Sequence, residues 1–316
     1  MKKSYITLIV SVLLGTAFTS NAQQDPQYTQ YMYNTQVVNP AYAGSREALS
    51  ISGLYRTQWV GLDGAPDTGT LTVHSPIGEG NVGLGLSIVR EEIGIVEETY
   101  ANIDFSYTIQ TSDIGKLAFG IKAGGNLYNL NFTDLNIPPE GQGDIFENDV
   151  DNKFKPQIGA GAYYYTDKFY AGLSVPNFIE SSYFDIADIE NFEATGDVIS
   201  RERLHFFFIS GYVFDLSENV KFKPAVLTKL VTGSPLQVDA SANFMFYDKF
   251  TLGAAYRWSA SLSALVGFQI TDELMLGFAY DRETTDLTQF NDGSYEFYLR
   301  YEIFKKKERI LSPRFF

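Results

Sequence analysis

Fourteen segments of the chain alternate between apolar and polar residues with a period of two, and no other feature of the sequence restricts the fold so strongly. In one of the clearest, Phe250, Leu252 and Ala254 alternate with Thr251 and Gly253. A two-residue period places each set on one face of a β-strand. The predicted strands lie near 48–57, 67–74, 81–90, 97–110, 115–128, 154–165, 168–175, 203–215, 220–230, 236–246, 249–257, 261–271, 273–282 and 294–304.

The connections between these segments alternate in length. Those after even-numbered segments are short and rich in turn residues, as at 166–168, whereas several after odd-numbered segments are long: 129–153, 176–202 and 283–293. Outer-membrane barrels combine short periplasmic turns with long outer loops. A soluble sandwich has no physical reason to alternate short and long connections in this order. The sequence therefore predicts an all-β fold, a transmembrane antiparallel outer-membrane β-barrel of about 14 strands with both chain ends in the periplasm.

The two faces of the predicted strands differ in chemistry. Leu276 and Phe278 belong to the apolar face that should meet lipid, and Met275 belongs to the face toward the lumen. Charges such as Asp239 and Arg257 recur on the lumenal face, which favours pairing across neighbouring strands, with a selective pore as the alternative. The glycine-rich stretches 85–94 and 115–125 lack the spacing of a phosphate loop, and we interpret them as places where strands curve.

The first 22 residues have the pattern of an export signal. Lys2 and Lys3 precede an apolar stretch over 6–18, and Ala22 ends a small-x-small cleavage pattern. Segment 23–46 is rich in Gln, Asn, Tyr and Pro and lacks the alternation, which favours a short helix or coil in a polar lumen. The predicted parts are a signal peptide (1–22), an N-terminal periplasmic or lumenal segment (23–46), the barrel (47–304) and a basic C-terminal tail (305–316). The predicted location is the outer membrane, as an integral protein.

The composition argues against several kinds of site. The chain has no Cys, two His and a net charge of −14, which exclude thiolate chemistry and multi-histidine metal sites and disfavour nucleic-acid binding. No catalytic motif is present, so the sequence predicts no enzyme, no cofactor and no metal. The loops 129–153 and 176–202 carry six and seven acidic residues. They are either solvated surface or contacts for divalent cations or a surface partner, and the run from Asp144 to Asp151 lacks the Gly and Glu of an EF-hand loop.

Two stretches resemble a known family. Near the predicted cleavage site the chain reads DPQYTQYMYN (25–34), VNPAYAG (38–44), YRTQWVG (55–61) and GAP (64–66), and its end carries YEF (295–297), KKK (305–307) and SPRFF (312–316). These sequences resemble the opening and the closing strand and tail of the PorP/SprF family of type IX secretion system membrane proteins of Bacteroidota. The motif residues, interpreted as structural or partner contacts, are Gln27, Tyr28, Gln30, Tyr31, Asn39, Pro40, Tyr42, Gly44, Arg56, Gln58, Trp59, Gly61, Gly64 and Pro66. Alternatively, Arg56 and Trp59 anchor the first outer loop at the lipid headgroups.

The resemblance implies an outer-membrane component without catalytic residues that supports secretion and surface anchoring of large cargo proteins, such as gliding adhesins. It implies three partners: other type IX secretion components, a large secreted surface protein with a C-terminal sorting domain, and outer-membrane lipid. Two other functions stay open, a passive porin or small-molecule transporter and a barrel-embedded hydrolase using His74 and His205. A secretion barrel predicts a filled lumen with little conductance, whereas a porin predicts steady open-channel current.

Overall fold

The computed structural model of the chain describes residues 26–78, 80–135, 149–181 and 203–304, together with residues 312 and 314. The predicted signal peptide, most of the two acidic loops and most of the basic tail lie outside the described residues.

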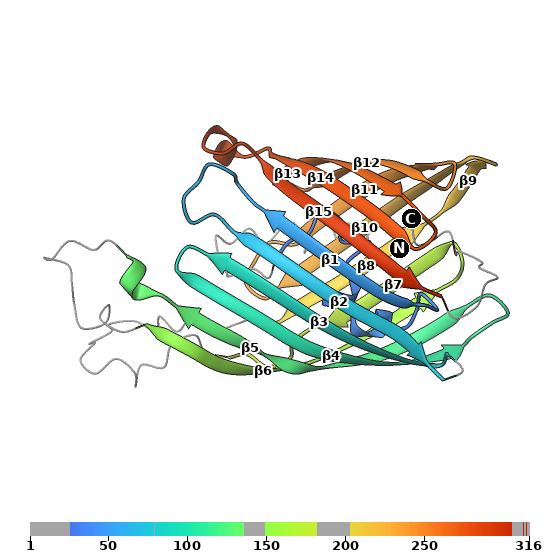
Figure 1. Cartoon of the computed structure of the whole chain (residues 1–316), viewed down its shortest axis with the longest axis horizontal. Coiled ribbons are helices and arrows are strands. Elements are labelled where there is room, and N and C mark those ends of the chain that lie inside the picture. Colours follow the sequence, from blue (N-terminus) through green and yellow to red (C-terminus); the bar gives the residue numbers. More distant parts are fainter. Residues whose placement is uncertain are drawn as a thin grey trace, which may run out of the picture.

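The described strands form one closed antiparallel β-barrel (Figure 1). Consecutive strands pair with one another around the sheet, and β15 pairs with β1, which closes it. β8 and β9 both pair with β10 and are separated only by Val213, so together they act as one strand of a fourteen-stranded barrel, as the sequence predicts. The strands are β1 (Leu49–Thr57), β2 (Asp67–Ile77), β3 (Val82–Ile93), β4 (Val96–Gln110), β5 (Lys116–Leu130), β6 (Val150–Tyr165), β7 (Phe169–Val175), β8 (His205–Tyr212), β9 (Phe214–Ser217), β10 (Val220–Val231), β11 (Gln237–Phe246), β12 (Phe250–Arg257), β13 (Ser261–Gln269), β14 (Leu274–Glu283) and β15 (Ser294–Ile303).

The two ends of the barrel carry different connections. The short-turn end, at the right of Figure 1, has the connections 78–81, 111–115, 166–168, 218–219, 247–249 and 270–273. The long-loop end, at the left, has the long connections 58–66, 131–149, 176–204 and 284–293 and also the short ones 94–95, 232–236 and 258–260. The predicted difference between the ends is therefore present, although three connections at the long-loop end are short.

The expected loop 129–153 is shorter than predicted because strand structure extends into both of its ends. β5 continues to Leu130 and β6 begins at Val150, and these two residues are cross-strand partners. Tyr128 and Leu130 are buried and pack with Phe132 and Val150 in a small apolar cluster. Such cross-strand contacts stabilise a hairpin beyond the barrel wall.

The strands present opposite chemistry on their two faces, in the predicted register. Leu276 is 40% exposed on the outer face, whereas its neighbour Met275 is 2% exposed and faces inward. Charges on the inner face pair across adjacent strands: Arg257 donates to Asp239 at 2.6 Å, and the two residues are cross-strand partners. The packed core of the protein lies in the lumen, where the short helix α2 (Thr35–Val38) and the 3-10 turn η1 (Pro40–Tyr42) meet inward-facing side chains of the wall.

Two further 3-10 turns, η2 (Phe132–Asp134) and η6 (Asp286–Gln289), lie in connections at the long-loop end. Within the described residues, the helices are all too short or too polar to traverse a bilayer.

Candidate functional site

Residues 26–46, here called the plug, run through the lumen from the long-loop end to the short-turn end (Figure 1). Gln27 donates to Gln237, the first residue of β11, at the long-loop end. Arg46 forms an ion pair with Glu302, close to the last residue of β15, at the short-turn end. None of residues 26–46 is exposed. Cavities of about 70 and 20 Å³ flank residues 26–28, and otherwise the plug packs closely against the wall.

Segment 23–46 is predicted to be periplasmic or lumenal, and its described residues 26–46 lie in the lumen, with Gln27 at the long-loop end and Arg46 at the short-turn end. The physical reason is the polar character of the segment. Its amide and hydroxyl groups need buried partners, and the inner face of the wall supplies them along the whole length of the lumen.

At the long-loop end the plug is held by an arginine–acid cluster, defined as Thr29, Gln30, Arg56, Asp281 and Glu296. The backbone N–H groups of Thr29 and Gln30 donate to the two carboxylate oxygens of Glu296 at 2.8 and 2.7 Å. Arg56 contacts Asp281 at 2.6 Å and Glu296 at 3.1 Å and donates to the Thr29 hydroxyl at 2.9 Å. The Arg56 and Asp281 side chains are each 1% exposed and that of Glu296 is fully buried, so these charge-assisted hydrogen bonds are shielded from water.

Two tyrosines fix the middle of the plug. The hydroxyl of Tyr31 lies 3.0 Å from the hydroxyl of Ser241 on β11. The backbone carbonyl of Tyr33 accepts a hydrogen bond at 3.2 Å from Tyr298 on β15, whose ring stacks on that of Tyr33 with centroids 5.3 Å apart. The plug therefore contacts wall strands on separate parts of the barrel through both ring packing and hydrogen bonds.

Two amide side chains continue this attachment toward the short-turn end. Gln36 donates to Asp104 on β4 at 3.0 Å. Asn39 donates to the backbone carbonyl of Ala162 on β6 at 3.1 Å, and its side-chain oxygen accepts from the N–H of Ala41 at 3.0 Å, which caps η1. A buried amide that uses both its donor and its acceptor in this way fixes the local path of the chain.

Glycines of the wall face the plug where the approach is closest. A Cβ atom added at Gly120 would lie 2.2 Å from the backbone nitrogen of Ala41, and one at Gly83 would lie 2.2 Å from the carbonyl oxygen of Ala43. Real Cβ atoms do not approach so closely, so any side chain here would displace the plug or the wall. The glycines whose added Cβ would come within 3.0 Å of a plug atom, here called the wall glycines, are Gly83, Gly85, Gly120, Gly161, Gly172 and Gly277.

The wall glycines change the interpretation of the two glycine-rich stretches. Gly85 and Gly120 make room for the plug and not for strand curvature, since their nearest neighbours are Gln36 and Ala41. Gly124 fits the original interpretation better, because an added Cβ would meet Ala101 on the adjacent strand. Alternation alone places all three on strands and does not distinguish these two roles.

The plug leaves the lumen through a turn at Gly44. This residue has φ +76°, in the left-handed region that favours glycine, and its added Cβ would lie 2.7 Å from Gly83. Its N–H donates to Nδ1 of His74 at 3.1 Å. The ring of Tyr42 meets His74 and Tyr163 edge-on, at centroid distances of 5.4 and 5.5 Å. His74 therefore has a structural role at the end of the plug.

Arg314, in the C-terminal tail, docks against the same end. Its guanidinium donates to the carbonyl of Thr166 at 2.8 Å and to that of Ser45, in the plug, at 2.9 Å. It also lies over the ring of Tyr165 at 4.4 Å. These contacts join the plug, the β6–β7 turn and the C-terminal region at the short-turn end.

Five further motif residues lie in the β1–β2 connection at the long-loop end. Gln58 accepts a hydrogen bond from Arg56 at 3.2 Å, and its N–H donates to the carbonyl of Pro66 at 2.9 Å. The carbonyl of Gly64 accepts from the N–H of Gly94 at 3.0 Å, which ties this connection to the β3–β4 turn. The connection is thus joined directly to the arginine–acid cluster.

Trp59 and Gly61 complete this connection. The indole N–H of Trp59 donates to Glu283 at the end of β14 at 3.0 Å, and Gly61 has φ +99°. Trp59 is half-buried and lies at the mouth of the barrel. Arg56 is 1% exposed inside the lumen, so the alternative in which Arg56 reaches the lipid headgroups is wrong.

The motif residues predicted from the sequence lie in the plug, at Arg56 on β1 and in the β1–β2 connection, and these parts meet at the arginine–acid cluster. The sequence alone does not identify their partners, which are Asp281, Glu296 and the wall glycines. The parity of each strand puts these residues inside the barrel. It does not show which height of the wall each plug residue reaches: Thr29, for example, is 252 positions from Asp281 and 267 from Glu296.

The arrangement holds a segment of the chain by hydrogen bonds, ion pairs and close packing. Within the described ranges, no group of three or more His, Asp or Glu could hold a metal ion. His74 contacts the plug, and His205 stacks on Phe207 with centroids 6.3 Å apart. Asp144 and Glu147 of the acidic run lie outside the described residues.

The chain resembles solved outer-membrane barrels at low sequence identity. Omp33 of Acinetobacter baumannii is 9% identical with a TM-score of 0.48, over 81% of this chain and 98% of that chain. The CymD monoaromatic hydrocarbon channel is 11% identical with a TM-score of 0.47, over 93% and 97%. A FadL homologue of Pseudomonas aeruginosa is 13% identical with a TM-score of 0.45, over 91% and 95%. No curated protein matches the chain.

A family comparison covers nearly the whole molecule. The model described as the type IX secretion system membrane protein PorP/SprF matches residues 20–301. This range includes the plug, the β1–β2 connection and the strands that carry the arginine–acid cluster and the wall glycines. The closed antiparallel barrel has the apolar outer face of an outer-membrane protein, and the chain therefore belongs to the PorP/SprF family of type IX secretion system membrane proteins, as an integral β-barrel of the outer membrane.

Proposed function

We propose that this barrel is a non-enzymatic component of the type IX secretion system that supports secretion and surface anchoring of large cargo proteins, such as gliding adhesins. The observation that carries the proposal is the filled lumen. Residues 26–46 occupy it from end to end and are held by buried ion pairs, which suits a scaffold better than a diffusion channel. Family membership supports association with other secretion components.

In this proposal the short-turn end faces the periplasm and the long-loop end faces the cell surface, as in other outer-membrane barrels. The beginning of the plug then lies at the surface mouth, and the junction of plug, β6–β7 turn and Arg314 lies on the periplasmic side. A small labelling tag placed directly before Gln27 should be reachable by antibody on intact cells, whereas a tag in the turn 111–115 should not.

The cargo contact is assigned to the outer loops 129–153 and 176–202, which are the longest and most acidic connections. Partners on the periplasmic side would meet the basic tail from Lys305. Shortening either loop should release cargo into the medium without unfolding the barrel, because loop length has a small effect on stability.

Deletion of the gene tests the proposal. Labelling of intact cells should show the loss of one or a few large surface proteins, and uptake of small solutes should be unchanged. Re-expression of the full chain should restore display. Normal surface display in the deletion strain would contradict the secretion role, and a defect confined to solute uptake would favour a transporter.

A further inference from the structure

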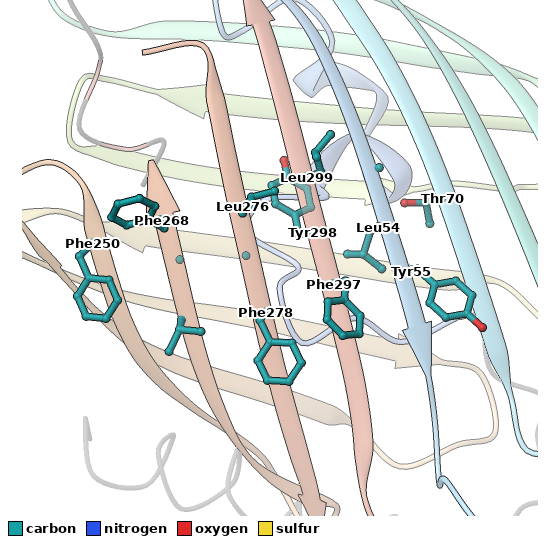
Figure 2. A pocket seen from close by; sticks show the side chains of 14 residues that line it. Leu54, Tyr55, Thr70, Phe250, Phe268, Leu276, Phe278, Phe297, Tyr298 and Leu299 are labelled. Atoms are coloured by element: carbon teal, nitrogen blue, oxygen red, sulfur yellow. The ribbon is translucent and has the colours of Figure 1, made fainter. Parts of the chain in front are cut away.

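The outer face of the barrel carries an apolar groove of about 620 Å³ that the secretion role does not use (Figure 2). It begins at Phe250 on β12, crosses β13, β14, β15 and β1 and reaches β2 at Thr70. Its volume lies in the range of small-molecule sites, roughly 300–1,000 Å³. Because the chain is an integral outer-membrane barrel, this face borders the hydrocarbon region and not water.

The floor of the groove is a row of cross-strand partners whose side chains point into the lumen. The row runs from one strand to the next through Gly267, Gly277, Tyr298, Leu54 and Thr70. Only their backbone reaches the outer face, so the row forms a trough.

Two rows of outward side chains form the ridges on either side of this trough (Figure 2). Phe278, Phe297 and Tyr55 are successive cross-strand partners in one ridge. Leu276 and Leu299 are partners in the other. The ridges therefore stand two residues apart along each strand.

Gly53 leaves a gap in the second ridge, where this ridge reaches β1. It is the cross-strand partner of Leu299 and alternates with the inward-facing Ser52 and Leu54, so its missing side chain would point outward. A Cβ atom added there would meet nothing closer than the carbonyl oxygen of Thr70 at 3.8 Å. The gap at Gly53 is therefore open space, and no neighbouring atom requires a glycine at this position.

The width and length of the groove indicate which kind of molecule it can hold. Two residues along a strand separate the ridges by roughly 7 Å, which admits one polymethylene chain but not an α-helix with a diameter of about 10–12 Å. A partner strand cannot add to the sheet, because a closed barrel has no free edge. The floor of the groove, from Gly267 on β13 to Thr70 on β2, is roughly 19 Å long at about 4.8 Å per strand, a length suited to an extended acyl chain.

The groove begins at the short-turn end, where Phe250 is the first residue of β12 and pairs with Phe268. Lys249, in the turn before β12, and Glu273, in the turn before β14, are both exposed there. The same two turns expose Asp248, which pairs with Lys221, and Asp272. The mouth therefore carries charges of both signs, which suits a zwitterionic headgroup. We propose that the groove holds one acyl chain of a zwitterionic phospholipid from the leaflet at the short-turn end.

Photo-crosslinking tests this site. The purified full chain is reconstituted in vesicles of phosphatidylethanolamine carrying a diazirine midway along one acyl chain, and the cross-linked peptides are mapped by mass spectrometry. Cross-links should concentrate on residues 266–278 and 297–299. Gly53→Leu should reduce them several-fold by filling the gap. Gly69→Leu is the matched control, because Gly69 lies on the adjacent strand in open space and outside the groove.

A boiling-dependent shift in gel mobility verifies that each variant is folded, and Phe297→Ala, which removes part of one ridge, replaces Gly53→Leu if that variant does not insert. Cross-links spread evenly around the barrel, or unchanged by both groove variants, would overturn the proposal. Stronger labelling of the groove by a lipid A probe than by phosphatidylethanolamine would overturn the choice of phospholipid.

Discussion

The two ends of the plug are attached to the same barrel by different physical means. Near the long-loop end the arginine–acid cluster holds the backbone of Thr29 and Gln30 through buried charges. Toward the short-turn end the plug backbone lies against Gly83 and Gly120, with no room for another atom. Charges can be removed together without leaving one unpaired, whereas a steric fit is lost with any added side chain. This difference predicts that further substitutions can restore stability lost at the arginine–acid cluster but not stability lost at Gly83 or Gly120.

The largest effect is expected from Gly120→Val. Its Cβ would overlap the main chain at Ala41, which no side-chain rotation can relieve, so the effect should exceed the roughly 1–3 kcal/mol typical of overpacked cores. We expect the plug to leave its place in most molecules. Because the chain has no Cys, a single Ala43→Cys reporter measures this as labelling by a water-soluble thiol reagent.

The control for this prediction is Gly69→Val with the same reporter. Gly69 faces outward with nothing within 4 Å of an added Cβ, so labelling should remain as low as in the parent. Protection of Ala43→Cys in the Gly120→Val background would show that the wall can move, and that the fit at the short-turn end is less strict than described.

Arg56→Met tests the other end. The change leaves Asp281 and Glu296 buried without their cation, and breaking a buried ion pair from one side typically costs about 3–5 kcal/mol. Urea unfolding in lipid vesicles should show this decrease in the free energy of unfolding.

The triple variant Arg56→Met, Asp281→Asn, Glu296→Gln distinguishes the two modes of attachment. It removes all three charges together and should recover a large part of the lost stability. If the triple variant is as unstable as Arg56→Met, the cluster acts through its geometry and not through its charges, and the proposed contrast between the two ends fails.

The sequence predicts the wall of this molecule better than its interior. Period-two alternation places Met275 and Leu276 on opposite faces because strand geometry is local. The contacts of the plug are not local: Thr29 and Glu296 are 267 positions apart. Which wall residue meets which plug residue depends on the stagger of the strands around the barrel, and a single sequence does not contain that information.

The family motif identifies residues that hold the plug in place, but it does not show which residues of the wall they contact. Asn39 and Gly44 belong to the resemblance, and the structure places them against Gly161 and Gly83. A motif read alone gives one side of each contact. The other side consists of glycines, which carry no functional group to single them out.

Arg314→Ala should have a smaller effect than either change in the lumen wall. It removes hydrogen bonds to Thr166 and Ser45 and the contact with Tyr165, and a hydrogen bond from a charged group contributes about 1.5–3 kcal/mol. A Ser45→Cys reporter should become more reactive. Arg314→Lys keeps the charge but not the planar fork and should recover only part of the protection. Unchanged reactivity of the Ser45→Cys reporter in Arg314→Ala would show that the C-terminal region does not hold the plug in place.

The smallest effect concerns the hairpin beyond the barrel wall, at the ends of β5 and β6. Asp149, just before β6, accepts hydrogen bonds from the N–H and the hydroxyl of Thr133 at 2.9 and 2.8 Å, and these bonds lower the pKa of its carboxyl. A lowered pKa in the folded state means that the local stabilisation is complete above the unfolded pKa of about 3.9. This stabilisation is lost as the pH falls through the pKa of Asp149 in the folded state.

Hydrogen exchange at Thr133, corrected for its intrinsic pH dependence, should therefore speed up below about pH 4. Asp149→Asn should show faster exchange already at neutral pH and no such acid transition. Protection of the plug amides should be the same in both proteins, because Thr133 and Asp149 lie in the β5–β6 connection and not in the plug. If acid loosened Thr133 and the plug together, the two regions would form one cooperative unit, and the comparison of the two ends would have to include the hairpin as well.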